Sequence, residues 1–337
     1  MISDKRITLA HGSGGLQTHK LIKNLFRKYF SNKYLNPLED SALLKTGTEN
    51  LLFTTDSHVI KPLFYPGGDI GKLAVSGTVN DLAVCGAVPQ WISCGMIIEE
   101  GFSIDDLEKI VISMKQTAED AGVQIVTGDT KVVERGNADG IYINTAGIGT
   151  RIEGVDLGVH NIQPGDMVII NGYIGDHGAA IITTREKFPI NIDIKSDCRP
   201  LNKETIALLS KLDGIRIMRD PTRGGVATTL NEFVENQGYG VQIIEKNCPI
   251  RPVVSGLCEP LGFDPLYLAN EGKLIIVVAS DEAQNVIEIL KSFPENDNPC
   301  IIGEVVEEPK GKVVMETSIG SSRILDMLSG EMLPRIC

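Results

Sequence analysis

The sequence predicts a mixed α/β (α+β) protein with two domains. The chain has 337 residues, more than a single hydrophobic core usually serves. Hydrophobic patterns typical of strands and of helices alternate in both halves, and a turn cluster rich in Gly and Pro lies between them at residues 163–166. We therefore expect one domain over residues 1–158, a second over 159–317, and a closing segment over 318–337 that ends in a tail.

In the first half, short apolar runs and helical spacing alternate along the chain. Ser103 is expected to cap a helix that Gly122 ends. Ile70, Leu73, Ala74 and Val84 are expected to form the buried side of an earlier helix. The hydrophobic spacing predicts strands at residues 5–9, 51–55, 59–60, 124–127 (a buried strand) and 142–149, and helices at 16–29, 69–86 and 104–121.

The second half repeats this mixture. An apolar strand follows the turn cluster, and helical and strand patterns then alternate to residue 292. The patterns predict strands at 167–171 and 274–279 and helices at 204–212, 225–237 and 281–292. A parallel or mixed sheet covered by helices is the usual outcome of such alternation.

Composition excludes several classes of protein. The chain is 42% hydrophobic and 23% charged, as in soluble globular proteins, and has no apolar run of about 18 residues that would span a membrane. It shows no signal-peptide pattern, and its 7 cysteines form no C-x-x-C pair, which favours a cytoplasmic location with reduced thiols. The net charge of −12 argues against nucleic acid as a partner, but carboxylates can gather Mg²⁺, which can hold a triphosphate.

Five aspartates stand beside small residues in turns, at strand ends or on a helix. For any one of them, a turn or a helix cap is the more common role. Together they would suit a divalent cation that prefers oxygen ligands, at a sheet edge where a ligand can be met. They are Asp40, Asp56, Asp81, Asp129 and Asp220.

Other residues are candidates for nucleotide chemistry. No Walker A pattern occurs, so ATP would bind through Mg²⁺ and the glycine-rich turn at 11–15, which is also typical of a plain tight turn. Lys131 lies two residues after Asp129 and would stabilise phosphoryl charge, unless it is simply an exposed lysine. Glu271 precedes an apolar strand and is either a turn residue or an active-site carboxylate.

The last residue is a cysteine, Cys337, preceded by Pro334. Prenylation needs three residues after the cysteine, so this is no prenylation signal. The thiol is either carried on an idle solvated tail or delivered by that tail into a pocket or to a partner.

With these residues in view, the chain resembles the HypE family of hydrogenase maturation proteins, which are carbamoyl dehydratases. The motif GDTKVVERG at 128–136 and the ending LPRIC at 333–337 are the most specific features. The resemblance covers essentially the whole chain and is carried by residues 10–15, 66–75, 128–136, 174–178, 219–225, 267–274, 323–328 and 333–337.

The resemblance implies a two-domain fold like that of PurM, the aminoimidazole ribonucleotide (AIR) synthetase, and of selenophosphate synthetase. The N-terminal domains of such proteins pair into a β-barrel in a homodimer. The resemblance also implies ATP and Mg²⁺, with Asp40, Asp56, Asp81 and Asp129 holding the metal. Further nucleotide contacts are then expected from Gly14, Gly15, Asn80 and Asp220.

The implied reaction begins when the carbamoyltransferase HypF loads a carbamoyl group onto Cys337. ATP then drives dehydration of this thiocarboxamide to a thiocyanate, with Lys131 and Glu271 as the catalytic side chains. The cyano group passes to iron on the HypC–HypD scaffold and becomes a cyanide ligand of [NiFe]-hydrogenase. Two alternatives remain open: an ATP-binding scaffold that only tethers a metallochaperone, and a small-molecule kinase-like synthetase, which would have no need of Cys337.

Overall fold

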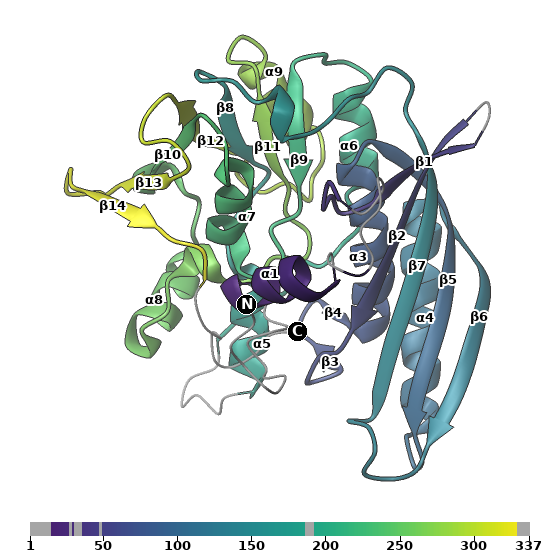
Figure 1. The fold of residues 1–337 in the computed structure, drawn as a ribbon. Coiled ribbons are helices and arrows are strands. Elements are labelled where there is room, and N and C mark those ends of the chain that lie inside the picture. Colours follow the sequence, from purple (N-terminus) through teal and green to yellow (C-terminus); the bar gives the residue numbers. More distant parts are fainter. Residues whose placement is uncertain (1–14, 27–28, 30–35, 47–48, 186–191, 329–337) are drawn as a thin grey trace.

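Two sheets and their helices form two domains that pack against each other (Figure 1). The computed structural model describes residues 15–26, 29, 36–46, 49–185 and 192–328 of the chain. The strand expected at 5–9 and the tail beyond 328 lie outside the described residues. None of the described helices has the length and unbroken apolarity needed to cross a bilayer.

The N-terminal sheet has the strand order β1-β2-β7-β5-β6. Its strands are antiparallel neighbours except for β5 and β6, which run parallel. Side chains alternate between a face covered by helices and an open face, as the pleat requires. The strands are β1 (Ala42–Thr46), β2 (Glu49–His58), β5 (Ala87–Glu99), β6 (Gln124–Val133) and β7 (Ile141–Arg151), beside a small ribbon of β3 (Phe64–Tyr65) and β4 (Gly68–Asp69).

Helix α4 (Ile104–Ala121) confirms its sequence signals. The Ser103 hydroxyl accepts the Asp106 N–H, and Gly122 ends the helix in the left-handed conformation that glycine adopts without strain. One face, including Ile110 and Met114, is buried, while the opposite face is in solvent.

Helix α3 (Ile70–Val84) is buried on all sides, which the one-sided pattern did not predict. Asp69 caps it, and its side chain accepts the N–H groups of Gly71 and Lys72. Ile70 and Leu73 pack on the N-terminal sheet, while Val84 joins the core of the second domain. Because α3 lies between the two domains, both of its faces must be apolar.

The C-terminal sheet is mixed, with the order β14-β13-β10-β12-β8-β11-β9. Its strands are β8 (Met167–Ile170), β9 (Ile215–Arg219), β10 (Gly240–Ile244), β11 (Ile275–Val278), β12 (Cys300–Val306), β13 (Val313–Glu316) and β14 (Ser322–Leu325). Helix α7 (Gly225–Val234) packs on one face, and α6 (Asn202–Leu209) and α9 (Ala283–Lys291) pack on the other. This double cover explains why β8 and β11 are apolar without alternation.

Apolar packing also joins the two domains directly. Helices α5 (Asp176–Arg185) and α8 (Pro252–Leu261) share one core with α3 and the N-terminal sheet. Helix α1 (Leu16–Leu21), continued by a π-helical turn (Ile22–Phe26), lies within the helix expected at 16–29. It packs beside α7 through ion pairs of His19 with Glu232 and Lys23 with Glu235.

A polar link between the domains is made by Asn80 of α3, which is fully buried. Its amide oxygen accepts the N–H of Leu201 at 2.8 Å, and its amide nitrogen donates to the carbonyl of Arg199 at 3.2 Å. The segment 196–201, which leads into α6, is thereby fixed to the N-terminal domain.

We expect Asn80→Ala to lower the free energy of unfolding by about 1–3 kcal/mol, because it leaves a buried N–H and a buried carbonyl without partners. Urea unfolding followed by circular dichroism measures this. Asn137→Ala, in an exposed hairpin, is the matched control. Equal stability of both variants would mean that the link contributes nothing.

Candidate active site

A cavity of about 1060 Å³ lies between the two domains. Its walls come from the segment 36–42, strand β2, helix α3, helix α1 and the loop that follows β9. Four of the five predicted aspartates line it, namely Asp40, Asp56, Asp81 and Asp220, together with Glu271. Residues from three distant parts of the sequence therefore meet at one site.

Strand pairing explains how the C-terminal domain supplies its two carboxylates. Strands β9 and β11 are antiparallel neighbours in which Arg219 faces Ile275. Asp220 directly follows β9, and Glu271 lies shortly before β11, so both fall at the same edge of the sheet. The structure therefore brings Asp220 and Glu271, two of the predicted site residues, to the same end of the sheet.

The N-terminal domain brings Asp56 on β2 and Asp81 on α3. The Thr54 hydroxyl lies 2.8 Å from Asp81 Oδ2 and 2.9 Å from the Asp40 carbonyl oxygen, so it bridges the two segments. Gly77 lets α3 approach β2 closely, because a Cβ at this position would lie 3.1 Å from Asp56 Oδ2. The strand expected at 51–55 extends to His58, so Asp56 lies inside β2 and not after its end.

Burial, and then repulsion from neighbouring carboxylates, raises the pKa of three of these carboxyl groups. Burial, with Asp40 as the next cause, raises the pKa of Asp220 to about 7. Burial also raises the pKa of Asp40 to about 6, although Arg219 opposes this. For Asp81, burial and then Asp220 and Asp40 raise the pKa well above its usual range. A cluster of buried carboxyl groups with raised pKa values favours the binding of a cation.

Cationic and imidazole side chains that the sequence reasoning did not single out also line the cavity. Arg219 pairs with Asp40 and, at 3.1 Å, with Glu39. His58 is buried, with Nε2 3.2 Å from the Thr145 hydroxyl and 3.5 Å from Asp56 Oδ2. Arg223 lies in the same wall. The motif at 219–225 already contained both arginines, so it was the available signal for them.

Asp129 and Lys131 do not reach this cavity within one chain. Both lie on β6, the edge strand farthest from β1, and their side chains are each 70% exposed, with Lys131 Nζ 3.1 Å from Asp129 Oδ2. The buried strand expected at 124–127 is corrected too, because all four of its residues are exposed. The sequence pattern could not show that β6 would form a sheet edge.

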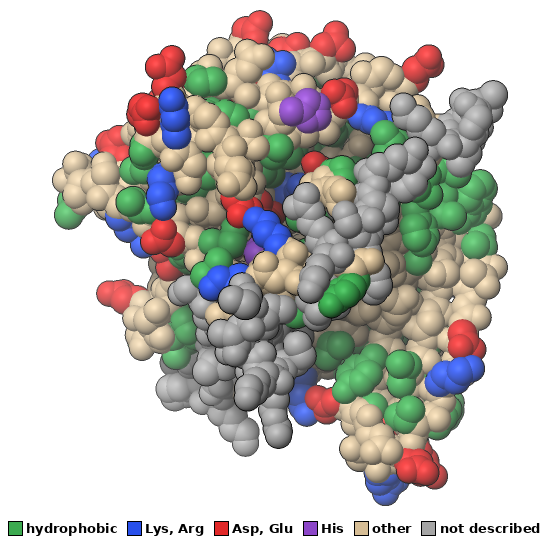
Figure 2. All heavy atoms as spheres, viewed as in Figure 1, with side chains coloured by type: hydrophobic (Ala, Val, Ile, Leu, Met, Phe, Trp, Pro, Cys, Tyr) green, Lys and Arg blue, Asp and Glu red, His purple; other side chains and the backbone are tan. Residues whose placement is uncertain are grey.

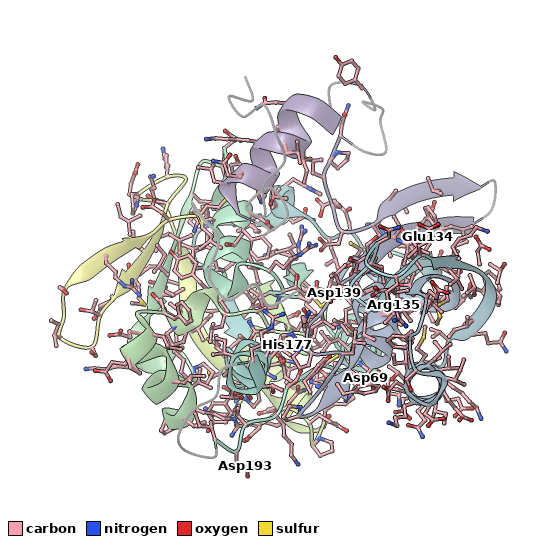
Figure 3. All side chains as sticks on the ribbon, turned by 90° about the horizontal axis from the view of Figure 1, so that it is seen from below. Asp69, Glu134, Arg135, Asp139, His177 and Asp193 are labelled. Carbon is pink, nitrogen blue, oxygen red and sulfur yellow. The ribbon has the colours of Figure 1, made fainter. Side chains whose placement is uncertain are left out.

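The hairpin after β6 lies at the far end of the N-terminal sheet. It contains Glu134, Arg135 and Asp139, which are labelled in Figure 3. The Glu99 carboxylate closes the hairpin by accepting the N–H of Gly136 at 2.6 Å and that of Gly140 at 3.0 Å. The conspicuous motif at 128–136 therefore lies on β6 and its hairpin, outside the lining of the cavity.

Two further residues predicted to contact the nucleotide, Asn80 and Gly15, are engaged in other interactions. Asn80 does not line the cavity, because its amide is engaged by Arg199 and Leu201. Gly15 caps α1 at a point where a Cβ would overlap the carbonyl oxygen of Leu328, so it serves packing there. Gly14 and Cys337 lie outside the described residues.

The expected metal site of four aspartates is not formed within one chain. Asp129 is remote, and among the residues that the structure describes, no three His, Cys, Asp or Glu side chains converge closely enough to hold a metal ion by themselves. Asp40 Oδ2 is nevertheless buried without a hydrogen-bond partner. This oxygen fits a cation whose remaining ligands come from elsewhere.

The raised pKa of Asp220 makes stability depend on pH. Between the ordinary value of 3.8 and about 7, the folded chain retains a proton that the unfolded chain releases, so stability falls as pH rises through this range. We expect Asp220→Asn to stabilise the ligand-free chain at pH 8 by more than about 1 kcal/mol and to change little at pH 4. Urea unfolding at both pH values measures this. The exposed Asp213→Asn is the control, and equal gains at both pH values would contradict the assignment.

Comparison with known proteins agrees with this architecture. Residues 38–151 match the N-terminal domain of AIR synthase related proteins, and residues 163–316 match the C-terminal domain. The carbamoyl dehydratase HypE of Rhodobacter capsulatus is 47% identical over 339 aligned residues, covering 100% of this chain and 99% of that protein.

Two solved structures are similar over nearly their full length. A HypE–HypF complex contains a chain with a TM-score of 0.87 and 47% identity, covering 91% of this chain and 99% of that chain. A HypE structure in complex with ATP has a TM-score of 0.82 and 44% identity, covering 97% and 98%. This chain therefore belongs to the HypE carbamoyl dehydratases of hydrogenase maturation, within the AIR synthase related family.

Proposed function

We propose that this carbamoyl dehydratase uses ATP to remove water from an S-carbamoyl group on its own Cys337, which leaves a protein thiocyanate. The thiocyanate then supplies the cyanide ligands of iron in [NiFe]-hydrogenase. The observation that carries the proposal is the acidic cavity between the domains, beside the point where the tail begins. A HypE relative of similar structure was solved with ATP, which supports nucleotide binding at such a site.

The root of the tail is held next to the cavity. The Leu16 N–H donates to the carbonyl of Leu328 at 2.7 Å, and the Tyr267 hydroxyl donates to the carbonyl of Asp326 at 2.7 Å. Residues 18, 19, 22 and 23, which follow Leu16, line the cavity. The 9 residues from 329 to 337 reach at most about 30 Å when extended, which is enough for Cys337 to enter the cavity from Leu328.

Mg²⁺ is expected to bind together with the nucleotide. Mg²⁺ in phosphoryl-transfer sites takes one or two carboxylates and completes its shell with phosphate oxygens and water. Asp40, Asp56 and Asp81 are the residues that would hold it, and the unpartnered Asp40 Oδ2 fits this role. When bound, the ion would neutralise charge on the phosphates.

Dehydration requires a good leaving group and a base. The amide oxygen of the thiocarboxamide attacks the γ-phosphorus of ATP and displaces ADP. The oxygen is then part of a phosphate, and phosphate leaves in place of oxide when the C–O bond breaks and the C≡N bond forms. Two N–H protons must depart, and Glu271 at the cavity wall is the candidate acceptor. Burial, followed by Asp220 and Asp197, raises the pKa of Glu271 well above the usual range, so it is a strong base once its own proton is lost.

A homodimer would explain the position of Asp129 and Lys131. The open face and the edge strand of the N-terminal sheet expose apolar side chains, among them Trp91, Ile97, Val126 and Val132. Hydrophobic side chains are visible over these strands at the right of Figure 2. Pairing of two such sheets would bury them and bring Asp129 and Lys131 to the neighbouring subunit's cavity.

The proposed partners follow from the reaction. HypF donates the carbamoyl group, in line with the solved HypE–HypF complex of a relative. The HypC–HypD scaffold accepts the cyano group. The whole sequence of transfers takes place in the cytoplasm. A scaffold that only tethers a metallochaperone would need no buried base such as Glu271, which favours the enzyme over that alternative.

Mass spectrometry of the C-terminal peptide tests the proposal. After incubation with HypF, carbamoyl phosphate and MgATP, we expect a carbamoyl adduct and then a cyano adduct on Cys337. Cys337→Ala should carry neither adduct and should bind ATP normally, because the described residues that line the cavity all lie between positions 18 and 271. The control is Cys300→Ala, which removes a partly exposed thiol of the C-terminal sheet. An adduct on another cysteine would refute the assignment.

Mixing two inactive variants tests the shared site. We expect Asp81→Ala and Asp129→Ala each to lose Mg²⁺-dependent ATP binding while the dimer persists. Mixed dimers regain binding in one of their two cavities, because one cavity then receives both intact aspartates. Calorimetry measures the number of sites. Asp120→Ala, on the outer face of α4, should bind normally. If the mixture binds no ATP, Asp129 does not act across the dimer.

A further inference from the structure

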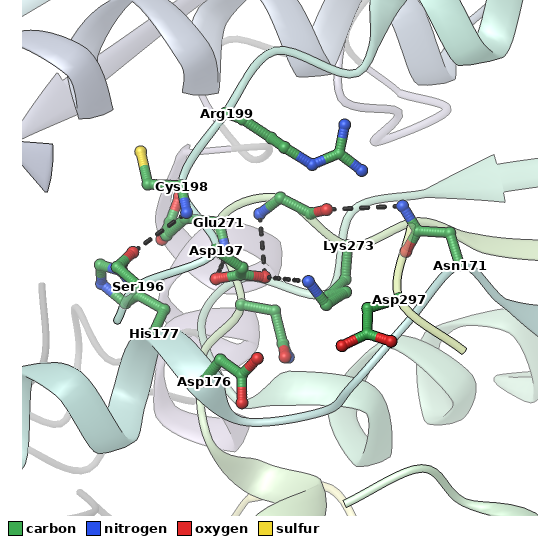
Figure 4. Close-up of polar contacts among 12 residues, drawn as sticks. Asn171, Asp176, His177, Ser196, Asp197, Cys198, Arg199, Glu271, Lys273 and Asp297 are labelled. Atoms are coloured by element: carbon green, nitrogen blue, oxygen red, sulfur yellow. Dashed lines mark hydrogen bonds and ion pairs between the residues drawn. The ribbon is translucent and has the colours of Figure 1, made fainter. Parts of the chain in front are cut away.

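Asp197 is a buried carboxylate that lies behind Glu271 and outside the cavity lining. Its Oδ1 accepts the Glu271 N–H at 3.1 Å, and its Oδ2 accepts the Gly272 N–H at 3.2 Å (Figure 4). The ammonium of Lys273 lies 3.1 Å from the same Oδ2, and the side chains of Lys273 and Asp197 are only 7% and 4% exposed. One carboxylate thus binds three consecutive residues.

The main chain of Glu271 is held on both sides by the same segment. Asp197 accepts its N–H, and its carbonyl accepts the N–H of Arg199 at 3.2 Å. Gly272 must be glycine here, because a Cβ would overlap the carbonyl oxygen of Asp197. The path of the chain through Glu271 is therefore set by segment 197–199.

Asn270 ties the other side of Glu271 to Asp220. Its backbone N–H and its amide nitrogen both donate to the Pro221 carbonyl, at 3.1 and 3.0 Å. Its amide oxygen accepts the Gly175 N–H at 2.7 Å. The loop that bears Glu271 is thus connected to the residue that follows Asp220.

Segment 197–201 also connects Glu271 to the N-terminal domain. Asn80, which holds Arg199 and Leu201, directly precedes Asp81 on α3. Segment 197–201 therefore contacts both Glu271 and the helix that bears Asp81. Its contacts help to set the position of Glu271 relative to Asp81 across the domain interface.

We propose that Asp197, with Lys273 as its counter-ion, is a positioning residue that holds the Glu271 carboxylate in place for proton removal. The role rests on the proposed dehydration. Asp197 acts through Glu271, since the cavity is lined by Glu271 and not by Asp197.

The charge of Asp197 is needed for this arrangement. Burial pushes the pKa of Asp197 upward, but Lys273, His177 and the N–H of Glu271 together lower it below its usual range. An ionised carboxylate accepts all three donors. An asparagine would turn an NH₂ group toward one N–H or toward the ammonium, and so would leave a buried donor unpaired.

Asp197→Asn should lower the rate of thiocyanate formation about 100-fold, as expected for a catalytic group displaced by about 1 Å. The affinity for ATP and the loading of carbamoyl onto Cys337 should stay as in the parent. In the background of Glu271→Gln, adding Asp197→Asn should cause no further loss, because the two residues act as one unit. A parental rate for Asp197→Asn, or multiplicative losses in the double variant, would overturn the proposal.

Asp166→Asn is the matched control. Asp166 is also a buried carboxylate of the C-terminal domain, accepts the N–H of Gln163 at 2.8 Å and pairs with Arg216, yet it is not part of the cavity wall. It should retain the parental rate. If Asp166→Asn loses as much activity as Asp197→Asn, the effect is general destabilisation and the proposal fails.

Amide hydrogen exchange separates this proposal from the proposed function. The peptide spanning 268–274 should exchange faster in Asp197→Asn than in the parent and in Asp166→Asn. Unchanged exchange refutes the positioning role even if dehydration occurs. If the parent itself forms no thiocyanate, the proposed function fails. Faster amide exchange of peptide 268–274 in Asp197→Asn would still show that Asp197 holds the loop that bears Glu271. If Asp197→Asn does not fold, Asp197→Glu replaces it in both experiments. Asp197→Glu keeps the negative charge but moves the carboxylate oxygens away from the N–H groups of Glu271 and Gly272. It should show the same loss of rate and the same faster exchange as expected for Asp197→Asn.

Discussion

The structure depends on holding several carboxyl groups together in a cavity where they repel one another. Asp40, Asp81 and Asp220 come from different segments, and burial and proximity raise the pKa of each. Without a ligand, such a cluster does not stabilise the folded chain, so other interactions must provide the stability of the fold. In the function proposed above, the benefit of the cluster is that its carboxylates would bind a cation together with the nucleotide.

Helix α3 is the element that makes this arrangement possible. It is apolar on both faces, and so it serves both the core that it shares with the N-terminal sheet, α5 and α8 and the core of the second domain. Three polar residues on or next to it fix its position and its role: Asp69 caps it, Asn80 binds segment 199–201, and Asp81 reaches the cavity. The relative position of the domains thus follows from the packing of one helix.

Much of the fold followed from local pattern. Helix α4 was predicted from Ser103 to Gly122, and strands β8 and β11 from apolar runs. The exposure of β6 was not predicted. Periodicity reports that a strand forms but not which neighbour it lacks, and among the described strands β6 pairs only with β5. Ile125 and Val126, within the strand predicted to be buried at 124–127, are therefore exposed.

For the site, the sequence by itself determined which residue types carry the chemistry: acidic side chains next to small residues, the glutamate before an apolar strand, and the motifs shared with the HypE family. Only the tertiary structure decided which of them meet. One cavity is lined by Asp40, Asp56, Asp81, Asp220 and Glu271. In contrast, Asp129 and Lys131 lie on the edge strand β6, and the amide of Asn80 is hydrogen-bonded in the domain interface. Asp197 and Lys273 became visible only as a pair behind Glu271. The reason is physical: a motif describes neighbours along the chain, whereas strand pairing and helix packing bring together residues that are far apart in the sequence, such as Asn80 and Leu201.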